Sequence, residues 1–134
     1  MAALFAPKTL TLLLKLAALA LLAALAAQPI LAGQHFSGQP HALQLHGAVG
    51  DTAAWLALGQ AALAGLCWYR GALRLSAALT FVLIFALVGL QLHAGYVRTL
   101  SLHIPLGAAL LALSLVTTMW LWRWPALRAP ATPD

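Results

Sequence analysis

Two histidines stand near the start of two long apolar stretches, in the segments LHGAVG (45–50) and LHIPLG (102–107). His46 is followed four residues later by Gly50, and His103 is followed four residues later by Gly107. Imidazole is a common ligand of transition metals. On a helix, a residue four positions away lies on the same face, and a glycine leaves that place free for a bulky group. The repeated His-x-x-x-Gly pattern therefore predicts two equivalent ligand positions.

The chain that must position these histidines is strongly apolar. Of its 134 residues, 63% are hydrophobic and 7% are charged, and the mean hydropathy is +0.94. A soluble domain carries about 25% charged residues. Asp51 and Asp134 are the only carboxylic side chains. So few charges cannot cover a soluble globule, and the composition predicts a protein whose solvent is the lipid bilayer.

Four apolar runs are each long enough to cross the ~30 Å of hydrocarbon in a bilayer. They cover approximately residues 10–32, 43–68, 73–96 and 100–122. Backbone groups in lipid must form hydrogen bonds within their own segment, so all four runs should be helices. Their connections are short, which favours antiparallel neighbours. We therefore expect an all-α membrane protein, a single domain over residues 1–134 built as a four-transmembrane-helix up-down bundle.

Helix-breaking residues mark the expected connections. The segment 69–74 should turn around Gly71, and the Pro-rich segment 123–134 should be a flexible cytoplasmic tail. The first connection, residues 28–42, contains two prolines and two glycines that should interrupt helix: Pro29, Gly33, Gly38 and Pro40.

The cations predict how the bundle is oriented. In an up-down topology six of the seven belong to one side: Lys8, Lys15, Arg70, Arg74, Arg123 and Arg128. Only Arg98 belongs to the other, so the positive-inside rule places both termini in the cytoplasm of a multi-pass protein of the inner (plasma) membrane. Cations at the ends of apolar runs do not form a stripe that follows phosphates, which argues against a nucleic-acid partner. Cleavage of the first run as a signal peptide near residues 24–27 is the alternative, and it would leave three spans.

With this topology, all five histidines fall in the outer end of the bundle. The second and fourth spans run parallel and face each other diagonally, which puts His46 and His103 at similar depth. Two such imidazoles can bind one iron from opposite sides of a porphyrin, so we expect heme b ligated by this pair. The alternative is that the histidines only reach headgroups or water and that the glycines pack helices.

The segment LQLHAGYVRTLSLHIPLGAALLAL (90–113) resembles the heme A synthase family. In that family a helix with Gln-x-x-x-Gly and a short outer turn precede a helix that opens with a ligand histidine; the matching positions are Gln91, Gly95 and His103. The resemblance implies a four-helix half-bundle with heme between the second and fourth spans, ligated by His46 and His103 near the outer face.

The chain also departs from that family. The family has eight spans in two halves, and its second span usually contains Glu-x-x-His-Arg, where this chain has Leu43, His46 and Gly47. The first outer connection has no cysteine pair. Without the carboxylate implicated in oxidising the farnesylated heme, the resemblance favours a heme-binding scaffold. An oxidase completed by a homodimer is a further hypothesis.

Five other polar residues of the outer half have expected roles. Arg98 could pair with a heme propionate or anchor to headgroups, and His93 should line the pocket or bond a propionate. Asp51, inside a span, should be structural or support the site. His35 and His41 with His46 could hold copper or zinc, although solvated histidines are preferred.

These residues lead to two hypotheses of different classes. The first is a bis-histidine heme protein in electron transfer or heme handling, with quinol or another redox membrane subunit as partner. The second is a cofactor-free scaffold or accessory subunit.

Overall fold

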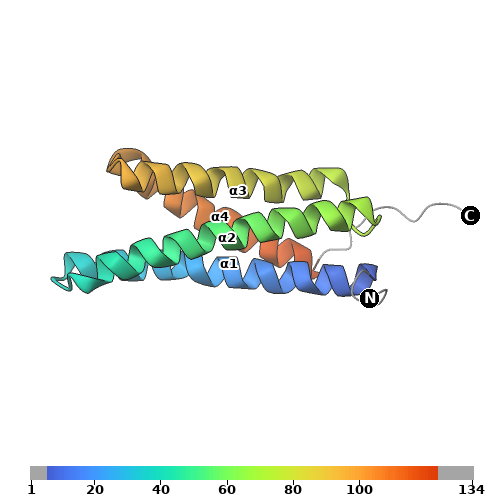
Figure 1. The fold of residues 1–134 in the computed structure, drawn as a ribbon, viewed down its shortest axis with the longest axis horizontal. Coiled ribbons are helices and arrows are strands. Elements are labelled where there is room, and N and C mark those ends of the chain that lie inside the picture. The colour runs from blue at the N-terminus through green and yellow to red at the C-terminus, as the bar shows by residue number, and fades with distance from the viewer. Residues whose placement is uncertain (1–5, 124–134) are drawn as a thin grey trace, which may run out of the picture.

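Four long helices make up the computed structural model, which describes residues 6–123. They are α1 (Pro7–Phe36), α2 (His41–Tyr69), α3 (Leu75–Tyr96) and α4 (Leu100–Arg123). They run alternately up and down, so the start of α1, the α2/α3 turn and the end of α4 lie at one end (Figure 1). The predictions of an all-helical chain and of four helices are confirmed, and the predicted tail lies outside the described residues from 124 onward.

The helices form a ring in which α1 and α3 each pack against both α2 and α4. The helices α2 and α4 therefore occupy one diagonal of the bundle. Large apolar side chains of α1 and α3 fill most of the core, among them Leu14, Leu21, Phe81 and Ile84. The buried positions of α2 are mostly alanine, and those of α4 combine Leu110 and Leu121 with small hydroxyl side chains.

The buried residues of α2 and α4 recur at alternating intervals of four and three, the spacing of helices that pack side by side. On α2 this seam consists of Ala53, Ala57, Gln60, Ala64 and Cys67. On α4 it includes Leu110, Ser114, Thr117 and Leu121. Both seams continue at the same spacing toward the end of the bundle that carries the α1/α2 and α3/α4 turns, which we call the outer end after the predicted orientation. There they reach Gly50 and His46 on α2, and Gly107 and His103 on α4. The register of the core thus turns both histidines inward.

All three turns end the preceding helix in the same way. At each helix end, one backbone N–H donates a hydrogen bond to the carbonyl three residues back, and the next N–H donates to the carbonyl five residues back. The first of these two bonds joins Gly38 to His35, Gly71 to Trp68 and Arg98 to Gly95. This pair of hydrogen bonds requires a residue in the left-handed conformation directly after the helix. Gly38 and Gly71 provide it with φ of 90° and 68°, and Arg98 provides it with φ of 57°. The prediction of a turn around Gly71 is confirmed.

The expectation that Pro29 and Gly33 would break helix is wrong, because α1 continues through both to Phe36. A proline inside a helix costs one backbone hydrogen bond, to the carbonyl four residues earlier. In an apolar segment an interrupted helix would leave several backbone polar groups without partners, so the helix continues and loses only one hydrogen bond. Pro105 is likewise accommodated within α4.

Three of the four helices are long and apolar enough to cross a membrane, namely α1, α3 and α4. The helix α2 is of similar length but carries Gln44, Asp51 and Gln60 in addition to two histidines, and it is not among them.

Candidate functional site

A layer of four polar side chains crosses the bundle near its outer end, one from each helix. It consists of Gln28 of α1, His46 of α2, Gln91 of α3 and His103 of α4, all partly buried. We call this set the Gln/His layer.

The two histidines of the Gln/His layer meet across the bundle. The centres of the His46 and His103 rings lie 6.0 Å apart, and the ring planes are inclined by 61°. Because α2 and α4 are diagonal neighbours, this contact joins helices that otherwise pack mainly against α1 and α3. The structure therefore brings together the two residues that the sequence singled out.

The first hairpin holds His46 through Gln28. The His46 Nδ1 lies 3.2 Å from the backbone oxygen of Gln28. The side-chain amide of Gln28 contacts the same ring, with one amide atom 2.9 Å from Nδ1 and 3.2 Å from Nε2. A single glutamine of α1 thus positions the imidazole of α2 from two directions.

The second hairpin repeats this arrangement. The His103 Nδ1 lies 3.0 Å from the backbone oxygen of Gln91, and the Gln91 Nε2 lies 3.5 Å from the His103 Nε2. A carbonyl only accepts hydrogen bonds, so Nδ1 of His103 carries the ring hydrogen. In His103 this tautomer leaves the lone pair on Nε2, which is the state of a metal-ligating histidine whose other nitrogen donates to a carbonyl. At His46 the Gln28 carbonyl and the Gln28 side-chain amide both contact Nδ1, so the role of that nitrogen depends on the tautomer.

Two of the predicted glycines make room for the Gln/His layer itself. A Cβ at Gly95 would lie 3.0 Å from Cε1 and 3.1 Å from Nδ1 of His103. A Cβ at Gly107 would lie 2.8 Å from Nε2 of Gln91. At Gly50 the space is less tight, since a Cβ would meet Leu92 at 3.4 Å. The first two glycines therefore allow a glutamine and a histidine to approach a helix backbone closely.

The separation of the two rings suits a shared metal. An imidazole nitrogen binds a first-row transition metal at about 2 Å, which places the ring centre about 3 Å from the metal. Two imidazoles on opposite sides of one metal therefore have centres about 6 Å apart. The observed 6.0 Å and the two Nδ1–carbonyl contacts both fit a bis-imidazole iron. Two imidazoles at this separation could therefore hold one metal ion between them.

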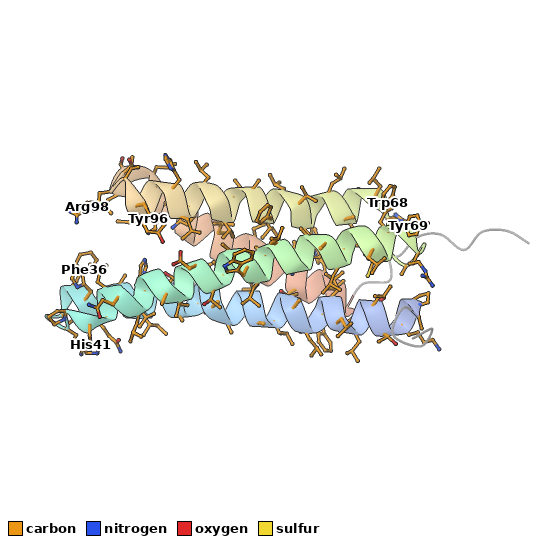
Figure 2. The ribbon with its side chains drawn as sticks, viewed as in Figure 1. Phe36, His41, Trp68, Tyr69, Tyr96 and Arg98 are labelled. Carbon is orange, nitrogen blue, oxygen red and sulfur yellow. The ribbon has the colours of Figure 1, made fainter. Side chains whose placement is uncertain are left out.

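The other predicted residues lie outside the Gln/His layer. His93 and Arg98 are exposed, and Figure 2 shows Arg98 near the end of the α3/α4 hairpin, with Phe36 and His41 at the end of the α1/α2 hairpin. Within residues 6–123, no three His, Cys, Asp or Glu side chains gather as a metal site. His35 and His41 therefore do not complete a copper or zinc trio with His46.

Asp51 has a partner that the sequence did not indicate. The Tyr96 hydroxyl donates a hydrogen bond of 2.7 Å to the Asp51 Oδ1. Both side chains are exposed, and the bond links α2 to the last residue of α3. It connects the two hairpins at the outer end of the bundle.

Sequence reasoning missed two residues of this region, Gln28 and Tyr96. Gln28 lies in both the first predicted run and the first predicted connection, and an amide at the end of an apolar run is a usable signal for a buried polar contact. Tyr96 had no distinguishing pattern. Comparison with protein-family models, with curated proteins and with solved structures gives no match to this chain.

Proposed function

We propose that this protein binds heme b through His46 and His103 near the outer face of a membrane. One observation carries the proposal: the two imidazoles lie 6.0 Å apart on diagonal helices, and each has its Nδ1 next to a backbone carbonyl. Histidines inside membrane helices are rare and mark cofactor or proton sites when they are paired.

The proposed membrane placement has all four helices crossing the bilayer, including α2, with both termini in the cytoplasm and the inner (plasma) membrane as the location. The cations support it. Lys8, Lys15, Arg70, Arg74 and Arg123 belong to one end of the up-down bundle, and Arg98 alone belongs to the other. Cytoplasmic segments carry the excess of Lys and Arg in membrane proteins.

In this proposal the chain's own residues hold and orient the ligands. His46 and His103 offer their Nε2 atoms, while the carbonyls of Gln28 and Gln91 contact the Nδ1 atoms and orient the rings. Gly95 and Gly107 keep His103 and Gln91 close to neighbouring backbones. The guanidinium of Arg98, at the same end, has the fork of donors that suits a propionate.

A bound heme would supply one-electron redox chemistry, and we propose electron transfer, or heme handling, as the role. A single heme near one face cannot carry electrons across ~30 Å of hydrocarbon. A quinol or another redox membrane subunit is therefore the proposed partner.

A second function is favoured by the contact between the two rings. In the structure, His46 and His103 already meet edge to face, and edge-to-face packing of rings is itself favourable. A polar layer of this kind can specify helix register without any cofactor. The protein would then be a membrane scaffold or an accessory subunit.

Absorption spectra distinguish the two functions. The protein is expressed with ample heme, purified in detergent, and measured as a reduced-minus-oxidised difference spectrum. Heme binding predicts bands that are lost in His46→Ala and in His103→Ala and kept in His93→Ala, the matched control, whose side chain is exposed on α3. A colourless wild-type protein would exclude the heme proposal, and loss of the bands in His93→Ala alone would show that His103 is not the ligand.

A further inference from the structure

A hollow lies between α3 and α4 at the cation-rich end of the bundle, far from the Gln/His layer. It is half-open and has a volume of about 190 Å³. An engineered cavity of about 150 Å³ accepts a benzene-sized molecule, so this hollow is wide enough for a stretch of hydrocarbon chain. The residues that line it come from the first two turns of α3 and the last turns of α4: Ser76, Ala77, Thr80, Phe81, Thr117 and Trp120.

A second hollow of about 160 Å³ adjoins the first along α4. Its lining residues are Val116, Met119, Trp120 and Arg123. Trp120 lines both hollows, so the two adjoin at this residue. Arg123, the last residue of α4, brings a cation to this otherwise apolar surface.

The walls of the first hollow offer few free hydrogen-bond donors. The Thr80 hydroxyl donates to the Ser76 carbonyl at 3.1 Å, and the Thr117 hydroxyl donates to the Leu113 carbonyl at 2.8 Å. Two of the three hydroxyls that line the hollow are therefore engaged within their own helices. The Ser76 hydroxyl and the Trp120 indole N–H are the remaining donors of the lining. Most of the wall is apolar, which suits an acyl chain because it needs no donor.

The charge at this end favours an anion. Within residues 6–123, five cations belong to it, namely Lys8, Lys15, Arg70, Arg74 and Arg123. The one carboxylate in the described part of the chain, Asp51, lies in the outer half of α2. Basic pockets between membrane helices on the cytoplasmic side bind anionic lipid headgroups.

We propose that the α3/α4 hollow binds one anionic phospholipid. The Arg123 guanidinium and the Ser76 hydroxyl contact the phosphate, and one acyl chain occupies the hollow against Phe81 and Trp120. This site is independent of the heme proposal, because none of its residues belongs to the Gln/His layer.

Native mass spectrometry in detergent tests the site with two probes of matched acyl chains, phosphatidylglycerol and phosphatidylcholine. The wild-type protein should retain phosphatidylglycerol in preference to phosphatidylcholine. Arg123→Gln should reduce this preference about fivefold, the usual contribution of one basic residue near an anionic lipid surface. Ser76→Leu, at an exposed position, should close the hollow and abolish retention of either lipid.

Arg98→Gln is the matched control, since it removes an exposed arginine from the opposite end, and it should leave the preference unchanged. Helix content measured by circular dichroism shows that each variant is folded. Equal retention of the two lipids by the wild type would overturn the proposal. So would an unchanged preference in Arg123→Gln and Ser76→Leu, or displacement of phosphatidylglycerol by a short-chain quinone at equal concentration.

Discussion

The hydroxyl of Tyr96, the last residue of α3, donates a 2.7 Å hydrogen bond to the carboxylate of Asp51 in α2. The glutamine–histidine contacts of the Gln/His layer each stay within one hairpin, α1/α2 or α3/α4. The Tyr96–Asp51 bond crosses from one hairpin to the other close to that layer. It therefore fixes the end of α3, where Gly95 contacts His103.

Removing either partner of this bond should loosen the outer end of the bundle. We expect Tyr96→Phe and Asp51→Ala to lower the thermal midpoint in detergent by similar, small amounts, because both side chains are exposed. The double variant should be no less stable than the less stable of the two single variants, since both changes remove the same hydrogen bond. Additive losses would show that the two residues act separately.

Two glycines of α3 should respond in opposite ways to alanine. A Cβ at Gly89 meets nothing within 4 Å, so Gly89→Ala should raise the free energy of unfolding by about 0.5–1 kcal/mol through reduced chain entropy. A Cβ at Gly95 would press on the His103 ring, which is held by Gln91, so Gly95→Ala should be destabilising by about 1 kcal/mol or more. Denaturation in mixed micelles measures both, and a stabilising Gly95→Ala would contradict the packing described here.

Arg98 occupies a backbone conformation that favours glycine. Its φ of 57° lies in the left-handed region, at the place where Gly38 and Gly71 end the other two helices. Arg98→Gly should therefore stabilise the protein by about 1 kcal/mol. Arg98→Gln removes the charge but keeps a Cβ, and it should leave the stability nearly unchanged. If Arg98→Gln stabilised as much as Arg98→Gly, charge and not backbone conformation would be the cause.

The proposed crossing of the membrane by α2 can be measured by cysteine labelling. In a Cys67→Ala background, single cysteines replace three exposed residues: Ser37, Tyr69 and Thr99. In right-side-out vesicles, an impermeant thiol reagent should label Ser37→Cys and Thr99→Cys, and it should label Tyr69→Cys only after the membrane is opened. Labelling of both Ser37→Cys and Tyr69→Cys in sealed vesicles would show that α2 does not cross.

The sequence predicted the helices well because each is a long apolar segment whose backbone has no other means of forming hydrogen bonds. The expected runs and the helices differ by at most four residues at either end, the largest difference being the end of α1 beyond Pro29. The local rule that proline breaks helix was outweighed there by the need to keep the backbone bonded in an apolar segment.

The pairing of His46 with His103 was predictable, because the sequence places both near the start of spans that run in the same direction. The contacts around them did not, because they depend on how far one hairpin slides along the other. The bond from Tyr96 to Asp51 shows this: the last residue of α3 is level with a residue ten positions into α2, since the α1/α2 hairpin extends farther than α3/α4 (Figure 1). No pattern of residue types encodes that offset.

Each hairpin carries the same three residues: a glutamine, a histidine that it contacts, and a glycine one turn beyond the histidine. They are Gln28, His46 and Gly50 in the α1/α2 hairpin, and Gln91, His103 and Gly107 in the α3/α4 hairpin. The molecule is in this sense a covalent dimer of two-helix units, joined through the short turn around Gly71. A cut in that turn would separate no glutamine from its histidine. Two separately synthesised hairpins should then be able to find each other in the membrane and rebuild the Gln/His layer by association alone.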